Sequence, residues 1–168
     1  MISIREETPA DYDAIREVNR LALWGDAEGQ LIDRLRAEGL MIASLVAEVD
    51  GRVVGHILFS EVAIETPGGA VRAAALAPMA VRPEWQRRGI GSALVRRGLE
   101  VCRERGHAIV LVVGHPDYYP RFGFSAELAR RLSSPFSGDA FMALELRPGA
   151  LEGVTGTVQY PEAFNAAE

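Results

Sequence analysis

The chain has 168 residues, of which 48% are hydrophobic and 24% are charged, a composition typical of one globular domain that buries a sizeable core. Its formal net charge of −5 argues against a nucleic-acid-binding protein, because such a protein would present a basic face. The single cysteine, Cys102, excludes an internal disulfide, no zinc-ligand spacing is present, and no apolar run approaches the ~20 residues that a membrane-spanning helix needs.

The beginning of the chain is expected to form one short strand and two helices. Polar and apolar residues alternate over residues 2–5, as they do in a strand. Thr8 is a suitable N-cap, and Pro9 is favoured at the first helical position, so a helix should start directly after them. A second helix is expected over residues 27–38 and should end at Gly39.

The middle of the chain predicts a sheet of long strands. Residues 44–49 and 52–64 should form a hairpin, because Asp50-Gly51 between them is a strong turn signal. Residues 71–81 form the next expected strand. Pro78 lies inside this strand and has no N–H to donate, so we expect a bulge or an unpaired gap there.

A glycine-rich loop follows that strand and predicts an anion-binding site. Gly89 and Gly91 allow the backbone to bend tightly and to lie close to a ligand. The apolar spacing becomes helical over residues 91–105, so the loop should lie at a helix N-terminus, where unpaired amides and the macrodipole attract an anion. Arg87 and Arg88 add positive charge beside this site, which suits a phosphate or pyrophosphate.

Three phosphate-binding motifs are candidates for the loop. A P-loop requires a lysine, and the chain contains none. The dinucleotide fingerprint requires a third glycine, where the chain has Leu94, and an acidic residue after the next strand, where it has Val113-Gly114. The third pattern, Gln/Arg-x-x-Gly-x-Gly/Ala, is matched at every fixed position by residues 86–91. This stretch resembles the acetyl-CoA pyrophosphate loop of the GNAT superfamily of N-acyltransferases.

A second motif of the same superfamily follows about 30 residues later. Residues 108–113 are all apolar and predict a strand covered on both faces. The next stretch, residues 115–124, resembles the GNAT pattern aromatic-Tyr-x-x-aliphatic-Gly-Phe, with Tyr119 on the family's tyrosine and Gly123-Phe124 on its closing pair. The sequence of residues 115–124 further resembles that of a YhbS-like bacterial subgroup. A last strand is expected over residues 141–146.

The resemblance implies a fold and an activity. The expected fold class is α/β (α+β), the GNAT acyl-CoA N-acyltransferase fold, with a mixed, splayed central sheet of about seven strands flanked by about four helices. Residues 1–168 should form one domain, with residues 148–168 as a tail that packs on it or on a second subunit. The expected reaction transfers the acetyl group of acetyl-CoA to a primary amine of a small molecule or a protein. We expect a cytoplasmic bacterial enzyme with no nucleic-acid or membrane partner, and the resemblance suggests a homodimer.

The cofactor-binding residues implied by the resemblance lie on the strand and on the loop. The strand before the loop should pair with the pantetheine arm and offer amides to the thioester carbonyl. At least one of the two loop arginines should contact phosphate. The residues are Met79, Ala80, Val81, Gln86, Arg87, Arg88, Gly89, Ile90, Gly91 and Ser92, and no metal is expected.

The catalytic residues are less well specified. Tyr119 is the leading general acid for the departing thiolate, and its structural alternative is an aromatic packing residue. Residues 71–78 contain no glutamate, where many relatives carry one, so the base is open between His115, Glu61 and a chain of water molecules. The structural alternatives are that His115 caps a strand end and that Glu61 faces solvent.

Several other side chains are given structural interpretations. His56 and His107 are expected on strand surfaces, Tyr118 in the core, and Cys102 as an inert core thiol, which favours direct transfer in a ternary complex. The acidic residues of the second-helix region either recognise an amine or coat the helix; they are Asp26, Glu28 and Asp33. Two alternative functions stay open, a non-catalytic acyl-CoA sensor and a nicotinamide-dependent oxidoreductase.

Overall fold

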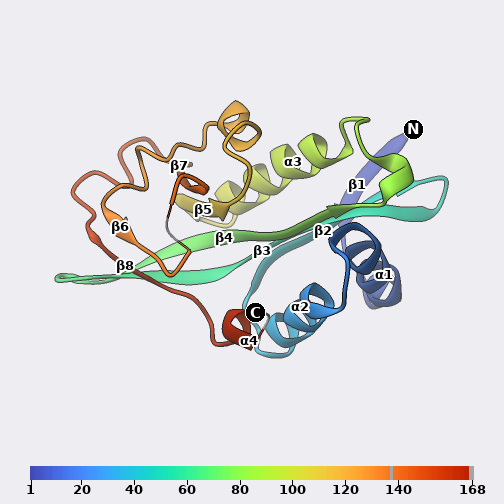
Figure 1. The fold of residues 1–168 in the computed structure, drawn as a ribbon, viewed down its shortest axis with the longest axis horizontal. Coiled ribbons are helices and arrows are strands. Elements are labelled where there is room, and N and C mark those ends of the chain that lie inside the picture. The colour runs from blue at the N-terminus through green and yellow to red at the C-terminus, as the bar shows by residue number, and fades with distance from the viewer. Residues whose placement is uncertain (137, 167–168) are drawn as a thin grey trace.

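A long antiparallel hairpin forms the centre of the molecule (Figure 1). It consists of β3 (Arg52–Thr66) and β4 (Gly69–Val81). The computed structural model describes residues 1–136 and 138–166. The eight-stranded sheet has the order β1-β2-β3-β4-β5-β7, and β8 pairs with β3 and with β6. The remaining strands are β1 (Ile2–Glu6), β2 (Met41–Val49), β5 (Ile109–Val113), β6 (Leu132–Ser133), β7 (Phe141–Glu145) and β8 (Gly156–Gln159).

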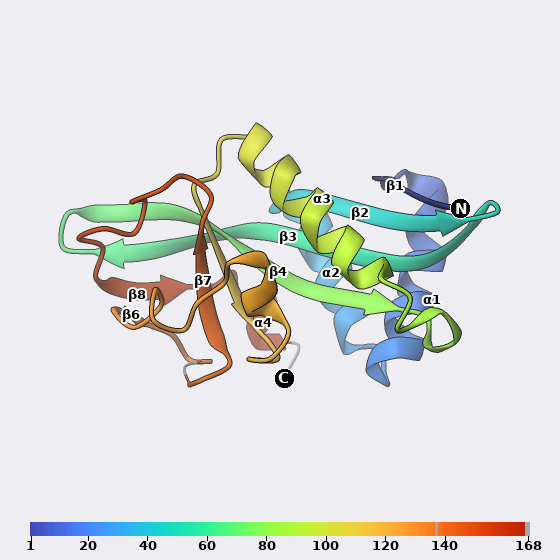
Figure 2. The ribbon, with the colours of Figure 1, turned by 90° about the horizontal axis from the view of Figure 1, so that it is seen from above.

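The sheet is mixed and splayed, as expected. Strands β4 and β5 are parallel, and they pair only where Ala74–Leu76 face Val110–Val112. Beyond Leu76 the two strands diverge, as Figure 2 shows. The edge of β4 from Ala77 to Val81 that faces away from β3 therefore has no strand partner among the described residues.

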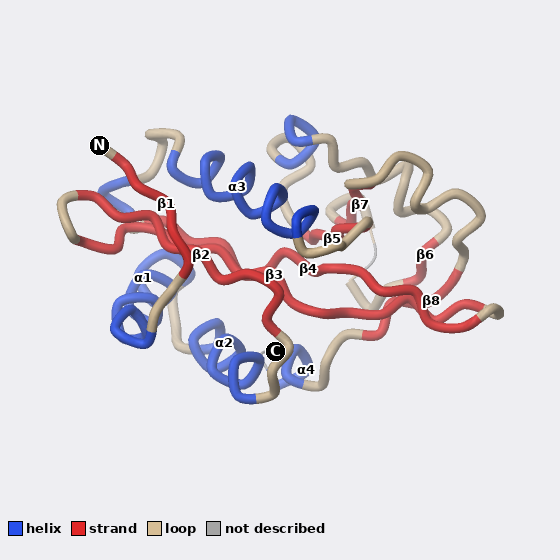
Figure 3. The backbone as a smooth tube through the Cα atoms, turned by 180° about the vertical axis from the view of Figure 1, so that it is seen from behind, coloured by secondary structure: helices blue, strands red, loops and turns tan. Residues whose placement is uncertain are grey.

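Helices cover both faces of the sheet. Figures 1 and 3 show α3 (Ile90–Glu104) on one face and α1 (Tyr12–Leu23), α2 (Ala27–Ala37) and α4 (Ala163–Ala166) on the other. Each face has its own hydrophobic cluster. Because side chains alternate along a strand, Leu58 of β3 packs with the α1 and α2 side, whereas Ile57 and Phe59 pack with the α3 side.

Local sequence signals account for the main turns. Asp50 and Gly51 both have positive φ, 50° and 79°, as a type I′ hairpin turn requires. The predicted irregularity at Pro78 is present: Met79 pairs with Ile57 and Leu76 with Phe59, so β4 has one residue more than β3 between these pairs. The bulge is the physical result of a residue without an N–H in a long strand.

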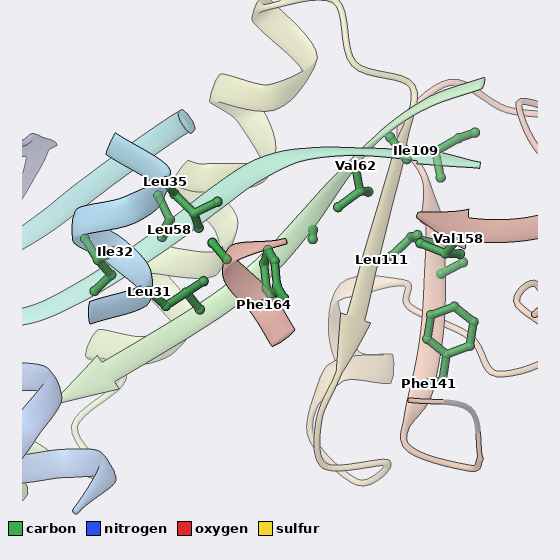
Figure 4. Packing of buried hydrophobic residues seen from close by; sticks show 14 of the residues in the cluster. Leu31, Ile32, Leu35, Leu58, Val62, Ile109, Leu111, Phe141, Val158 and Phe164 are labelled. Carbon is green, nitrogen blue, oxygen red and sulfur yellow. The ribbon is translucent and has the colours of Figure 1, made fainter. Parts of the chain in front are cut away.

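The C-terminal segment adds to the sheet and to one helical layer. Strand β8 pairs with β3 through Ala63–Glu65, and α4 packs against α2. Figure 4 shows Phe164 of α4 and Leu31 of α2 close to β4 in the same cluster. The sheet has eight strands where about seven were expected; β8 belongs to this segment, and the two-residue β6 lies before β7.

Two histidines expected on strand surfaces are instead buried, so that interpretation was wrong. His56 is fully buried and His107 is 7% exposed. For His56 the reason is that helices cover β3 on both faces, which the sequence of the strand alone does not reveal. No helix among the described residues is both long and apolar enough to cross a membrane.

Candidate functional site

The glycine-rich loop leaves a set of backbone amides unpaired at the start of α3. Arg87 and Gly89 adopt positive φ, 65° and 82°, and the helix begins at Ile90. The first amide with an intrahelical partner is that of Ala93, which donates to the Gly89 carbonyl at 3.0 Å. The amides from Ile90 to Ser92 are thus free to bind an anion at the positive end of the helix dipole.

The side chain of Gln86 holds this loop against the sheet. Its amide Nε2 donates to the Val81 carbonyl at 2.9 Å, which joins the loop to the end of β4. The motif glutamine therefore fixes the distance between the strand edge and the helix N-terminus. Gln86 also lines the cavity above the loop.

The cavity above the loop has a volume of about 350 Å³. Arg87 and Arg121 line it, whereas the guanidinium of Arg88 lies over the Trp85 ring, 4.7 Å from its centroid. Trp85 also lines the cavity, so stacking holds Arg88 at its rim. Arg121 is a residue that sequence reasoning missed, because it lies in the second motif, far from the loop along the chain.

A second cavity, of about 450 Å³, occupies the splay between β4 and β5. Its walls are Ala77–Met79 of β4, the end of β5 from Val113 to His115, and residues from α1, α2 and α4. Tyr118 lines both cavities, and its hydroxyl lies 3.0 Å from Ser92 Oγ. An extended ligand with its phosphates on the loop can therefore reach the splay past Tyr118.

The sequence predicts Tyr118 in the core, and the structure differs. The structure makes it half-buried, with its ring packed on Phe122 and its hydroxyl at the loop. Arg121 supports it, because its Nε donates to the Tyr118 carbonyl at 3.0 Å and its guanidinium lies 4.6 Å from the ring centroid. Two adjacent tyrosines in a short helical segment were the only sequence signal for this role.

Tyr119 lines the cavity in the splay and is 7% exposed. Burial, and then the neighbouring Tyr118, raise the pKa of its hydroxyl to about 12. It is therefore protonated at neutral pH and can donate a proton. Its ring packs edge-on against Tyr118 and Phe124, and a Cβ at Gly114 would overlap it. None of the described residues hydrogen-bonds its hydroxyl, which leaves this group available to a ligand.

The structure brings His115 to the site but not Glu61. His115 is exposed and lines the splay cavity with Tyr119. Glu61 lies toward the α3 side of β3, where it pairs with Arg72 at 2.8 Å and with His107 Nε2 at 3.3 Å. It lines neither cavity, so it is not placed to accept a proton from a group in the splay.

The remaining cofactor candidates surround the two cavities. Met79 lies beside Gly91, where an added Cβ would be 3.4 Å from the Met79 sulfur. Ala80 and Val81 pair with β3 along one edge of β4, and their other edge faces the splay. Cys102 is fully buried, and burial raises the pKa of its thiol to about 12, as expected for an inert core thiol.

Of the acidic residues of the second-helix region, only Glu28 lines the splay cavity. Asp33 pairs with Arg16 at 2.7 Å, and Asp26 is exposed at the start of α2. A larger hollow, about 530 Å³, lies between residues 127–131 and 145–154, and none of the predicted site residues lines it. No cluster of metal-binding side chains occurs in the part of the chain that the structure describes.

Comparison with known proteins identifies the family. Residues 3–126 match the family model described as acetyltransferase (GNAT) domain. The uncharacterized N-acetyltransferase YhbS of Escherichia coli (strain K12) is 38% identical over 165 residues, which cover 96% of this chain and 98% of YhbS. The L-amino acid N-acetyltransferase AaaT of the same organism is 30% identical over 141 residues, covering 75% of this chain and 84% of AaaT.

Solved structures agree with this assignment. A crystal structure of E. coli YhbS in complex with CoA has a TM-score of 0.91 and 36% identity, covering 98% of this chain and 92% of that chain. A GNAT acetyltransferase from Brucella melitensis in complex with acetyl-CoA has a TM-score of 0.82 and 36% identity, covering 98% of each chain. With unpaired amides at the start of α3, a splayed sheet and relatives solved in complex with CoA and acetyl-CoA, the chain belongs to the GNAT family of acetyl-CoA-dependent N-acetyltransferases.

Proposed function

We propose that the chain transfers the acetyl group of acetyl-CoA directly to a primary amine bound in the splay of the sheet, within a ternary complex. The observation that supports this most is that Tyr118 lines both cavities. One cavity has the anion-binding loop, and the other has Tyr119 and His115. A cofactor held by its diphosphate on the loop would present its thioester to the second cavity.

The cofactor is held mainly by the backbone. The amides from Ile90 to Ser92 bind the diphosphate, and Arg87 and Arg121 neutralise its charge. The free edge of β4 from Ala77 to Val81 pairs with the pantetheine arm, as the edge of a sheet can pair with an extended ligand. Amides at Met79 and Val81 polarise the thioester carbonyl.

Proton transfers complete the reaction. The acceptor ammonium first loses one proton to His115, or to water beside it, and the neutral nitrogen then attacks the thioester carbonyl carbon. The carbon–sulfur bond breaks, Tyr119 donates its proton to the departing thiolate, and the second proton of the nitrogen returns through water to Tyr119. The products are an amide, free CoA thiol and one released proton.

The acceptor is a primary amine of a small molecule or a protein. The name of AaaT makes an L-amino acid one candidate.

Because acetyl-CoA is a cytoplasmic metabolite in bacteria, the cytoplasm remains the predicted location. The homodimer stays a prediction, which sedimentation equilibrium would test.

A conservative substitution tests the role of Tyr119. Tyr119→Phe keeps the ring in its packed position and removes only the acidic hydroxyl, so kcat should fall by about 10² to 10³. The Kd for acetyl-CoA, measured by calorimetry, should change by less than about twofold. Unchanged turnover would remove Tyr119 from the mechanism.

Tyr118→Phe is the matched control, because it makes the same chemical change one residue away. It removes the hydroxyl that lies beside Ser92, so the Kd for acetyl-CoA should rise while kcat falls by less than about tenfold.

If no amine in a broad panel releases CoA thiol although acetyl-CoA binds, the chain would act instead as a non-catalytic acyl-CoA sensor.

A further inference from the structure

The splay cavity borders an apolar side pocket of about 170 Å³. The two spaces share four lining residues, which are Leu76, Ala77, Val113 and Phe164. Val113, the last residue of β5, is 47% exposed although it is apolar, and it lines both spaces. A ligand in the splay can therefore extend past Val113 into the side pocket.

The far wall of the side pocket is aromatic. The ring centroids of Phe136 and Tyr160 lie 5.0 Å apart, and those of Tyr160 and Phe164 lie 5.3 Å apart. The hydroxyl of Tyr160 accepts a hydrogen bond from Ser134 Oγ at 3.4 Å, so its polar end already has a partner. An apolar cavity of about 150 Å³ in another protein holds one benzene molecule, so this pocket has the size and chemistry for a single aromatic ring.

The formal charge that lines the splay cavity is negative. Glu28 of α2 lines it, is half-buried, and forms no ion pair or hydrogen bond with any described residue. No arginine among the described residues lines either the splay cavity or the side pocket. An ammonium group would be attracted to Glu28, whereas a substrate carboxylate would meet a like charge without a compensating cation.

We infer that the acceptor is a cationic amine that carries an aromatic or similarly bulky apolar group and no carboxylate, an inference that rests on the proposed acetyl transfer. The ring occupies the side pocket formed by Phe136, Tyr160 and Phe164. Glu28 attracts the ammonium group into the cavity, where His115 deprotonates it before attack. The decarboxylated counterparts of aromatic amino acids have this chemistry, and the amino acids themselves do not.

Matched acceptors test the two features separately. Initial rates of CoA thiol release are measured with 2-phenylethylamine, with L-phenylalanine, which adds only the carboxylate, and with ethylamine, which lacks the ring. 2-Phenylethylamine should have the highest kcat/KM, by at least about tenfold over each of the others. An equal or higher value for L-phenylalanine or for ethylamine would overturn the inference.

Variants assign these preferences to residues. Glu28→Gln should lower kcat/KM for 2-phenylethylamine by about tenfold, mainly through KM, while the Kd for acetyl-CoA stays constant. Asp26→Asn removes the same charge two residues away, outside both cavities, and should change kcat/KM by less than about twofold. If the two variants behave alike, Glu28 has no specific role.

Val113→Phe fills the mouth of the side pocket from a position that is already half exposed, so it should fold normally. It should abolish the preference for 2-phenylethylamine over ethylamine, and a retained preference would show that the ring binds elsewhere. Different results would contradict the proposed acetyl transfer and this inference. If the wild-type protein does not bind acetyl-CoA, the proposed transfer is wrong. If it binds acetyl-CoA but acetylates only other amines, only the inference about the acceptor is wrong.

Discussion

His56 of β3 has a hydrogen-bond partner on each ring nitrogen, although it is fully buried. The Asn19 amide Nδ2 lies 3.2 Å from Nδ1, and since this amide can only donate, Nδ1 accepts. The proton is then on Nε2, which donates to Ser44 Oγ at 2.9 Å. Ser44 in turn donates to Glu7 at 2.5 Å, so a neutral histidine links α1 to an acidic group beside Arg36.

This network predicts a pH dependence of stability. Burial, and then the positive charge of Arg36, lower the pKa of His56 to about 3, so the unfolded state binds an extra proton below about pH 6.5. The contribution of the neutral, buried His56 to the free energy of unfolding is complete above about pH 6.5 and is lost as the pH falls. The free energy of unfolding, measured with urea, should decrease by about 2 kcal/mol between about pH 7.5 and pH 5.

Comparison of variants isolates the contribution of His56. His107 also has a lowered pKa because of burial, so it adds to the slope in the same direction. His56→Gln should remove most of the slope, whereas His115→Gln, at an exposed position, should leave it unchanged. Identical slopes in all three proteins would contradict the assignment of a neutral, buried His56.

At the scale of the element, α3 serves the site at one end and the core along its length. In the proposed complex the unpaired amides of its first turn would bind the diphosphate, and its inner face packs Leu94, Val95 and Cys102 against the sheet. Gly98 lies on this inner face, where a Cβ would overlap the Phe59 ring. The absence of a side chain at Gly98 therefore sets how closely the helix approaches β3.

Gly98→Ala should consequently destabilise the protein. In an exposed helix this change is favourable by about 1 kcal/mol, but here the clash should dominate and lower the free energy of unfolding by about 1–3 kcal/mol. Gly29→Ala in α2 is the matched control, since its Cβ would meet only the flexible side chain of Arg16, at 3.1 Å. Urea denaturation of both variants should give shifts of different sign or clearly different size.

At the scale of the whole molecule, the cofactor would join the two diverging arms of the sheet. A ligand that binds only the folded state at about 100 times its Kd stabilises it by about 2.7 kcal/mol, which corresponds to a rise in Tm of roughly 5–10 °C for a chain of this size. Acetyl-CoA should produce this shift in a thermal melt, and NAD should not.

The variant Ser92→Asp separates binding from folding. A carboxylate in the first turn of α3 favours the helix dipole, so the Tm without ligand should change by no more than about 2 °C. The same charge repels a diphosphate, so the shift with acetyl-CoA should largely disappear. A full shift in this variant would mean that the cofactor does not bind at the N-terminus of α3.

The parts of the structure that could be predicted from sequence depend on local signals. The turn at Asp50-Gly51, the irregularity at Pro78 and the loop around Gly89 each result from backbone chemistry within a few residues. The acceptor side could not be predicted in the same way. It depends on which face of β3 each side chain occupies and on which distant segments meet there.

Glu61 illustrates the difference. In the alternation along β3 it follows Ile57 and Phe59, so it lies toward α3, whereas the splay cavity has walls from α1, α2 and α4. The sequence places Glu61 on a strand next to β4 but does not state which face holds the acceptor. Phe136 and Tyr160 could not be predicted as site residues for a related reason: β8, which precedes Tyr160, pairs with β3 and also with β6, which precedes Phe136.

The return of the C-terminal segment to β3 has a consequence for how the selectivity of such an enzyme can change. The family match ends at residue 126 and includes the cofactor loop, His115 and Tyr119, whereas the aromatic wall of the side pocket lies beyond it. In the proposed mechanism, the residues that bind the cofactor and transfer protons therefore lie within residues 3–126, whereas the aromatic wall that would select the acceptor comes from residues 127–168. A chimera that exchanges residues 127–168 between relatives should change the acceptor preference while the Kd for acetyl-CoA stays constant.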